Sequence, residues 1–143
     1  MKLATIGYER ATLPEVIARL KAAGVEVLID VRAVASSRRA GFSKTLLSAS
    51  LNAEGIGYVH LRQLGTPKPG RDAARKGRVA EMHAIFNDHM AEPAAQLELA
   101  KATEFARTKK TALLCYEAEH ADCHRAILAD RIRETLGCEI EPL

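Results

Sequence analysis

Short apolar segments alternate with helix-like segments along almost the whole chain, and this alternation limits the fold more than any other feature. The four apolar segments have the length of buried strands and cover residues 3–6, 25–31, 56–61 and 111–115. Stretches with apolar residues at helical spacing lie between them, and residues 139–143 are typical of an edge strand. Strands separated by helices predict a parallel sheet with right-handed crossovers. We therefore expect one α/β domain over residues 1–143, with a mostly parallel four- or five-stranded sheet flanked by helices in a Rossmann-like three-layer arrangement.

Local signals predict where several helices begin and end. Thr12 and Glu15 have the spacing of a capping box, so a helix is expected from Leu13, and Gly24 is placed to end it. Further helical patterns cover residues 43–55, 79–90, a stretch from Pro93, and a last helix whose first turn contains residues 123–125. Residues 65–78 combine two prolines and three glycines with five basic side chains and one acid. This composition predicts a mobile basic loop.

Composition excludes several classes of protein. Apolar residues make up 48% of the chain and charged residues 27%, which is typical of a globular fold. The net charge of +3 is spread over interleaved acids and bases, so no general nucleic-acid-binding surface is predicted. No signal peptide or membrane span is expected, and a cytoplasmic location follows. Three cysteines are an odd number in a chain of this size, which argues against a structural disulfide framework.

Polar side chains follow every predicted strand at its carboxyl end. These ends carry Gly7, Tyr8 and Glu9, then Asp30 and Arg32, then His60, and finally Cys115, Tyr116 and Glu117. Ligands of open parallel sheets bind at this edge, because loops and helix N-termini converge there. The sequence therefore predicts a polar pocket at the carboxyl edge of the sheet.

Each arginine near this edge can be interpreted either as a ligand-binding residue or as an ordinary structural or surface residue. Arg32 either pairs with Asp30 as a structural ion pair or binds an anionic ligand. Arg38 and Arg39 stand in a loop, before Phe42, that leads into a helix. There they either surround a phosphate or form an ordinary solvated surface.

Residues 113–125 contain the strongest chemical signal and allow three hypotheses. Cys115, Cys123 and His124, with His120 or Glu117, are zinc-ligand types, although the seven residues between the cysteines match no standard zinc motif. A second hypothesis is a nucleophilic thiol activated by the helix N-terminus and by His124. The spacing of cysteine and arginine differs, however, from the tight loop of phosphatases and sulfurtransferases.

The third hypothesis assigns the chemistry to a carboxylate. Glu117 is then the acid, base or nucleophile, and the cysteines are buried packing residues. In this case His124 and Arg125 bind the substrate. A carboxylate beside arginines suits cleavage of a glycosidic or a phosphate-linked bond.

Five motifs together resemble one known family. They are Thr-Ile-Gly-Tyr at residues 5–8, Val-Leu-Ile-Asp-Val-Arg at 27–32, Ser-x-Arg-Arg-x-Gly-Phe-Ser at 36–43, Tyr-Val-His-Leu-x-x-Leu-Gly at 58–65, and Leu-Cys-x-Glu at 114–117 with Cys-His-Arg at 123–125. In this order they resemble the family called domain of unknown function 488 (DUF488). The resemblance implies a compact α/β fold and an intracellular protein of bacterial or archaeal type, and it carries no established activity.

The resemblance also points to individual positions of this chain. It selects Gly7, Asp30, Arg32, Arg38, Phe42, His60, Cys115, Glu117, Cys123, His124 and Arg125. Glu9 and Thr66 depart from the residues expected in the family, a small residue and a glycine.

The combination of arginines, a helix N-terminus and titratable groups favours an enzyme that acts on a small phosphate-bearing or nucleotide-like ligand. The catalytic candidates are Glu117, Cys123, His124 and Cys115, and the ligand-binding candidates are Gly7, Tyr8, Asp30, Arg32, Arg38, Arg39, Phe42, His60 and Arg125. No metal ligand is assigned, and the cofactor and the oligomeric state stay open. Two alternatives are a non-catalytic module that binds nucleotide or nucleic acid through residues 65–78, and a redox- or metal-sensing protein that uses Cys115, Cys123 and His124.

Overall fold

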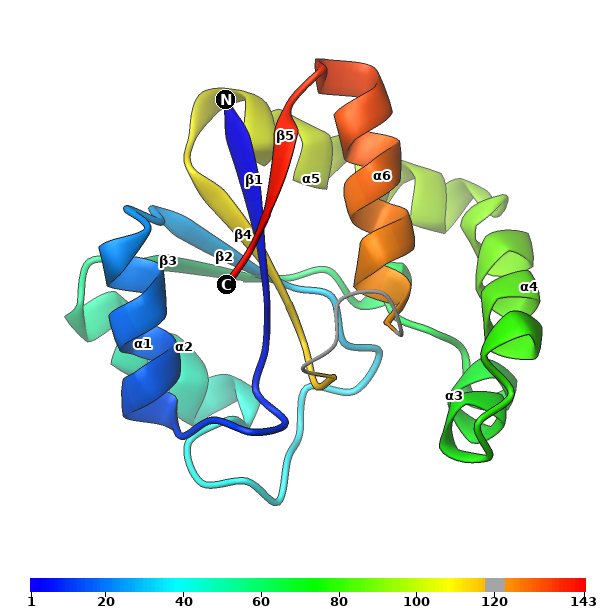
Figure 1. Ribbon diagram of the computed structural model, residues 1–143, viewed down its shortest axis with the longest axis horizontal. Coiled ribbons are helices and arrows are strands. Elements are labelled where there is room, and N and C mark those ends of the chain that lie inside the picture. The colour runs from blue at the N-terminus through cyan, green and yellow to red at the C-terminus, as the bar shows by residue number, and fades with distance from the viewer. Residues whose placement is uncertain (118–122) are drawn as a thin grey trace.

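One sheet of five parallel strands forms the centre of the protein (Figure 1). The computed structural model describes residues 1–117 and 123–143. The strand order is β3-β2-β4-β1-β5. The strands are β1 (Lys2–Gly7), β2 (Val27–Asp30), β3 (Gly57–His60), β4 (Thr111–Cys115) and β5 (Glu139–Pro142). The predicted parallel sheet is therefore confirmed, and β5 completes it as an edge strand beside β1.

Helices cover both faces of the sheet. They are α1 (Leu13–Ala22), α2 (Lys44–Ala53), α3 (Lys68–Arg75), α4 (Val79–Met90), α5 (Pro93–Thr108) and α6 (His124–Leu136), and a short 3-10 turn, η1 (Arg62–Leu64), follows β3. Figure 1 shows α1 and α2 on one side of the sheet and α5 and α6 on the other. The expected three-layer α/β arrangement is thus present.

The central strands are buried on both faces, so their successive residues enter two different cores. Leu28 packs with the helices α1 and α2, whereas its neighbour Ile29 joins the core beneath α5 and α6. Leu114 and Leu113 alternate in the same way in β4. Continuous apolar sequence is the expected signature of parallel strands covered on both sides. This explains why the short apolar segments were recognisable as strands.

Several local signals have the predicted effect. Thr12 caps α1 and forms a capping box with Glu15. Gly24 follows the end of α1 with φ of 72°, a left-handed conformation that glycine adopts without steric cost. The predicted ranges 79–90 and 111–115 coincide with α4 and β4.

The prediction of a loop over residues 65–78 is wrong, because residues 68–75 form α3. Proline is tolerated in the first turn of a helix, where its missing N–H has no intrahelical partner, and Pro69 stands there. Gly70 fits against its neighbours so closely that a Cβ atom would lie 2.4 Å from Cγ2 of Thr66. A Cβ atom there would also lie 3.3 Å from Cγ2 of Ile85 in α4, so packing against α4 stabilises a segment whose composition is typical of a loop.

The number of cysteines argued against a structural disulfide framework, but the structure contains one disulfide. Cys115 at the end of β4 and Cys123 immediately before α6 are joined by a disulfide, while Cys138 is a free, buried thiol. Both bonded cysteines belong to the core beneath α5 and α6. Their proximity results from the return of the chain to the end of β4, which the spacing in the sequence does not reveal. Among the described residues, no helix is long and apolar enough to span a membrane.

Candidate functional site

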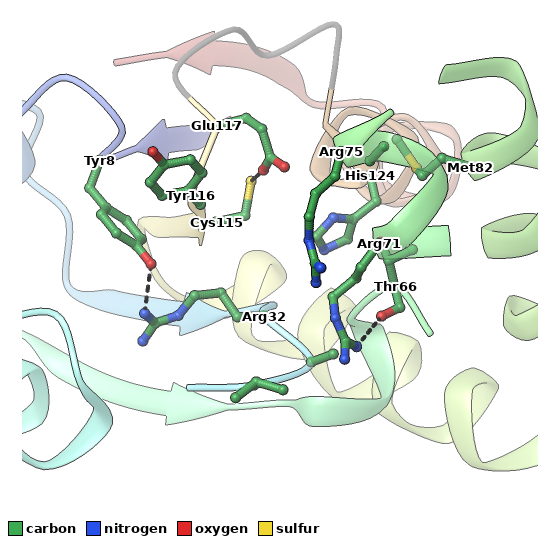
Figure 2. Close-up of a pocket in the computed structure, with 13 residues that line it drawn as sticks. Tyr8, Arg32, Thr66, Arg71, Arg75, Met82, Cys115, Tyr116, Glu117 and His124 are labelled. Atoms are coloured by element: carbon green, nitrogen blue, oxygen red, sulfur yellow. Dashed lines mark hydrogen bonds between the residues drawn. The ribbon is translucent and has the colours of Figure 1, made fainter. Parts of the chain in front are cut away.

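A cavity of about 500 Å³ lies at the carboxyl edge of the sheet. The connections from β1 to β2 and from β4 to β5 leave in opposite directions there, and β1 and β4 are neighbours. Such a switch of direction is where open α/β sheets bind ligands. Figure 2 shows the side chains around this cavity. The polar and aromatic ones are Tyr8, Arg32, Thr66, Arg71, Arg75, Tyr116, Glu117 and His124, and Cys115 also lines it.

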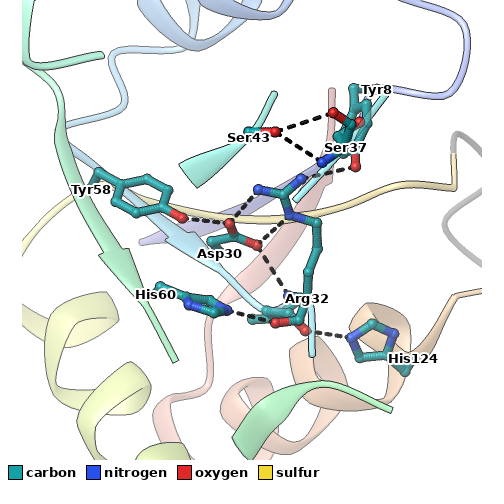
Figure 3. A network of polar contacts seen from close by, with 9 residues as sticks. Tyr8, Asp30, Arg32, Ser37, Ser43, Tyr58, His60 and His124 are labelled. Atoms are coloured by element: carbon teal, nitrogen blue, oxygen red, sulfur yellow. Dashed lines mark hydrogen bonds and ion pairs between the residues drawn. The ribbon is translucent and has the colours of Figure 1, made fainter. Parts of the chain in front are cut away.

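A buried ion pair forms one side of the pocket. Arg32 donates from Nε to Oδ1 of Asp30 at 2.8 Å and from Nη2 to Oδ2 at 2.7 Å (Figure 3). Tyr58 donates its hydroxyl to Oδ2 at 2.6 Å, and Arg32 donates from Nη1 to the hydroxyl of Tyr8 at 2.9 Å. Of the two interpretations of Arg32, the pair with Asp30 is the one found here, although Arg32 also lines the cavity.

Burial and hydrogen bonds in this network keep Arg32 protonated and charged, and Tyr58 protonated and neutral. Burial tends to lower the pKa of Arg32, but the hydrogen bonds and charge of Asp30 outweigh it and raise the pKa above its ordinary value. Burial and the hydrogen bond to Asp30 both raise the pKa of Tyr58. Arg32 therefore stays cationic beside an anionic partner. Since the two charges compensate each other, this pair adds little attraction for a ligand.

Two histidines bind the backbone that follows β2. Nε2 of His124 lies 2.8 Å from the carbonyl oxygen of Val31, and Nε2 of His60 lies 2.7 Å from that of Arg32. A carbonyl only accepts, so both imidazoles carry their proton on Nε2. Burial lowers the pKa of His124 to about 4, so the side chain is neutral at pH 7. His60 holds the backbone that follows β2 and does not line the cavity.

Aromatic side chains form a second part of the wall. Tyr8 stacks on Phe42 with ring centroids 4.2 Å apart, and it meets Tyr116 edge-on at 5.3 Å. Phe42 is a buried core residue behind Tyr8. The residue before Tyr8 has to be glycine, because a Cβ atom at Gly7 would lie 1.7 Å from the carbonyl oxygen of Glu117.

Arg125 connects the end of β4 with α6. Its Nη1 donates to Sγ of Cys115 at 3.0 Å and to the backbone oxygen of Glu117. Burial lowers the pKa of Arg125 to about 10, while the charge of Glu117 acts in the opposite direction. Arg125 is therefore still cationic at neutral pH. It serves as an internal support of the wall and does not line the cavity.

The opposite wall is contributed by α3, the segment that was predicted as a loop. Arg71 donates from Nη1 to the carbonyl oxygen of Thr66 at 2.9 Å. Arg75 lies one turn further along, with Nη1 3.3 Å from Oδ1 of Asp72 in an exposed ion pair. Neither arginine was among the predicted site residues, although residues 65–78 were expected to supply phosphate contacts in the binding-module alternative. Their spacing of four residues, which places both on one helix face, was the available signal.

Some predicted residues lie away from the cavity. Arg39 donates to the carbonyl oxygens of Glu9 and Ala11 at 2.6 and 2.8 Å, which ties its loop to the segment after β1. Arg38 is exposed, Asp30 is completely buried, and neither residue lines the cavity. The proposed zinc ligand His120 lies outside the described residues.

Cys115, Cys123 and His124 come together as one buried group. One potential ligand atom from each residue, a sulfur or an imidazole nitrogen, lies within 4.8 Å of the other two. Cys123 is the residue before the first turn of α6 and is only 1% exposed. As a disulfide, the two sulfurs offer neither a thiolate nucleophile nor a metal ligand until they are reduced.

Comparison with known proteins adds one finding. The family model described as "Domain of unknown function DUF488" matches residues 12–132. This range includes the end of β2, the α3 wall and the Cys-His-Arg segment. No curated protein and no solved structure matches the chain significantly.

Proposed function

The chain belongs to the family described as domain of unknown function DUF488, and because this description states no reaction, we propose its function from the pocket: an enzyme acting on a small phosphate-bearing or nucleotide-like ligand. One observation carries the proposal. Arg71 and Arg75 line the same cavity as Glu117, so anion-binding groups and a carboxylate surround a single space. Figure 2 shows the two arginines on the side of the cavity opposite Tyr8 and Tyr116.

Arg71 and Arg75 are the groups that we assign to a phosphate. Arg32 is neutralised by Asp30, whereas Arg71 donates to the carbonyl oxygen of Thr66 and has no carboxylate partner among the described residues. Arg75 makes a solvent-exposed ion pair with Asp72, and exposed pairs of this kind contribute about 1 kcal/mol or less. A phosphate can therefore replace Asp72 at little cost. Guanidinium groups also match phosphate oxygens in geometry.

The rest of the cavity suits a ligand with a ring. Its volume of about 500 Å³ falls in the range of small-molecule sites, about 300–1,000 Å³. Tyr116 is 45% exposed and is held edge-on by Tyr8, so it offers an aromatic face to a base or a sugar. We therefore place the phosphate near α3 and the ring near Tyr116.

Glu117 is the group that we assign to proton transfer. It follows β4 directly and lines the cavity, and Gly7 allows β1 to approach its backbone. Arg125 holds the backbone oxygen of Glu117, which fixes the start of the side chain. A positioned carboxylate acting as general acid or base contributes about 10²–10⁴-fold to a rate.

Binding is tested by isothermal titration calorimetry with AMP and ribose 5-phosphate, and with adenosine and ribose as phosphate-free counterparts. We expect the phosphate esters to bind, and we expect R71A and R75A to weaken them about 10- to 100-fold, the value of a hydrogen bond to a charged group. R107A is the matched control, because Arg107 makes the same i,i+3 pair, with Glu104, outside the pocket. Equal affinity for phosphate-free ligands, or an equal loss in R107A, contradicts the assignment.

Catalysis is tested separately with E117Q, which keeps the size of the side chain. Release of phosphate, base or sugar from the bound ester is followed by chromatography. We expect turnover to fall about a hundredfold or more while affinity is retained. A wild-type protein that binds the esters but converts none of them supports the non-catalytic binding module instead. Unchanged turnover in E117Q removes Glu117 from the catalytic groups.

A further inference from the structure

The group formed by Cys115, Cys123 and His124 has the composition and the position of a zinc site. We propose that, when the disulfide is reduced, Cys115 Sγ, Cys123 Sγ and His124 Nδ1 bind one Zn²⁺ ion whose fourth coordination position opens into the pocket. Sulfur and imidazole nitrogen are the ligands that zinc prefers in proteins. The inference does not depend on the proposed function, because metal binding is measured without any substrate.

The distance between Cys123 and His124 fits a tetrahedral zinc ion. Their Sγ and Nδ1 atoms are 3.6 Å apart. Zinc bonds of about 2.3 Å to sulfur and about 2.0–2.1 Å to nitrogen, at a tetrahedral angle, give a separation of about 3.6 Å. The two atoms thus already stand as neighbouring ligands of one ion.

The two cysteines have room to separate once they are reduced. Two sulfurs on one tetrahedral zinc ion stand about 3.8 Å apart. The Cα atoms of Cys115 and Cys123 are 7.6 Å apart, whereas disulfides usually have about 4.4–6.8 Å between these atoms. Rotation of the two side chains therefore suffices, without movement of β4 or of α6.

Reduction of the disulfide and binding of zinc are two separate steps. A phosphine reductant gives two electrons to the disulfide and becomes a phosphine oxide with the oxygen of a water molecule, whose two protons go to the sulfurs. The protein is left with two thiols. Binding of Zn²⁺ then releases both thiol protons to solvent, as thiolate coordination requires.

Neighbouring groups hold the ligands in the required form. Nε2 of His124 donates to the carbonyl oxygen of Val31 at 2.8 Å, so the lone pair of Nδ1 is the one available for a metal. A backbone carbonyl in this place is the usual partner of a zinc-bound histidine. Arg125 donates to Sγ of Cys115 at 3.0 Å, which stabilises a thiolate there. Val31 is fully buried, which fixes the ring of His124.

Among the described residues three side chains supply ligands, which leaves one coordination position toward the cavity. Cys115 and His124 both line the pocket, and so does Glu117, whose Oε2 lies 3.3 Å from Sγ of Cys115. Structural zinc sites have four protein ligands, whereas catalytic sites keep one position for water or substrate. With the ligands that the described residues supply, the site is of the second kind, and Glu117 lies beside the exchangeable position.

The test is a Co²⁺ titration of the 143-residue chain, reduced with a phosphine and kept under anaerobic conditions. Cobalt replaces zinc in tetrahedral sites and reports its ligands by absorbance. We expect one Co²⁺ per chain, a thiolate-to-cobalt charge-transfer band, and the strong visible bands of a tetrahedral ion. Zn²⁺ should displace the cobalt at an equal stoichiometry, and an excess of oxidant that restores the disulfide should release the metal.

Variants connect the signal to the proposed ligands. C115S and C123S should lower the charge-transfer intensity per cobalt and weaken binding at least about a hundredfold. H124Q removes Nδ1 but keeps a side-chain N–H for Val31, so it tests the third ligand in a protein that retains this contact. C138S is the matched control, because Cys138 is also a buried cysteine but has no part in the group.

Three results would overturn the inference. The first is reduced wild-type protein without a thiolate-to-cobalt band, and the second is a band of unchanged intensity in C123S. The third is H124Q with wild-type affinity and wild-type visible bands. If C115S or C123S does not fold, as judged by circular dichroism, H124Q and the stoichiometry of the wild type decide the question. R71A and R75A should bind cobalt normally, so a failure of phosphate binding and a failure of metal binding are distinguishable.

Discussion

Removing the charge of Asp30 is expected to destabilise the protein strongly. Its carboxylate is completely buried and accepts hydrogen bonds from the backbone N, Nε and Nη2 of Arg32 and from the hydroxyl of Tyr58. Asp30→Asn has nearly the same size. It removes the negative charge, however, and turns an acceptor toward Arg32 or Tyr58 into a donor. The guanidinium of Arg32 then stays buried without an anionic partner.

The size of the effect follows from the burial of the pair. Removal of one member of a buried ion pair costs about 3–5 kcal/mol. Unfolding entropy of about 2.1 cal/mol/K per residue gives about 0.3 kcal/mol/K for a chain of this length. The midpoint of thermal unfolding should therefore fall by about 10–17 °C. Since typical domains are stable by about 5–15 kcal/mol, this is a large fraction of the total.

The measurement is urea unfolding followed by far-UV circular dichroism, together with a thermal melt. Glu54→Gln is the matched control, because Lys21 and Glu54 also form a 2.8 Å ion pair but are 55% and 41% exposed. Its cost should stay below about 1 kcal/mol. A double variant, Asp30→Leu with Arg32→Met, should lose less than the sum of its two single variants. A loss in Asp30→Asn as small as in Glu54→Gln, or strict additivity in the double variant, would refute the reasoning.

Three further results are expected. Gly7→Ala places a Cβ atom 1.7 Å from the backbone oxygen of Glu117, so we expect a loss of about 1–3 kcal/mol or more in urea unfolding. Gly57→Ala meets only ordinary contacts at 3.5 Å and should change stability much less; a similar loss in both would contradict the steric explanation. Burial and the bond to Asp30 raise the pKa of Tyr58 above 10, so the unfolded chain loses this proton first and stability should fall as pH rises through the alkaline range. A spectrophotometric titration should show one late tyrosine that Tyr58→Phe removes, and a late tyrosine that persists in the variant would show that another residue is responsible. Thr12→Ala deletes the capping box of α1 and should cost about 1 kcal/mol in the same urea experiment, whereas an unchanged midpoint would show that the cap is dispensable.

The fold could be predicted from the sequence to the extent that local patterns determine it. The range of β4 was correct because a buried parallel strand is a continuous apolar segment, and α1 was located by Thr12 and Glu15. The helix α3 was missed because its prolines and glycines are typical of loops. It is stabilised by contacts such as that of Gly70 with Thr66 and Ile85, and no local pattern reveals contacts of this kind.

The candidate site was predicted in part for the same reason. The rule that strands deliver polar groups to one edge placed Arg32, Cys115 and Glu117 near one another, and all three line one cavity. It could not decide that Arg32 pairs with Asp30, since that depends on burial and on side-chain geometry. The disulfide of Cys115 and the wall formed by Arg71 depend on how distant segments meet, so the sequence alone did not indicate them.

The position of β4 between β1 and β2 has a consequence for synthesis of the chain. Among the described strands, β1 pairs with β4 and β5, and β2 pairs with β3 and β4. The first two strands to be made are thus not paired with each other, and they become part of one sheet only when residues 111–115 have been added between them. At about 5–20 residues per second, β2 waits about 4–17 s for its central neighbour. During this interval one edge of an apolar strand is unpaired, and unpaired edges of this kind attract other chains. The nascent protein is thus most prone to aggregation before its fourth strand has been synthesised. Chaperones that bind nascent chains would have their largest effect in that interval.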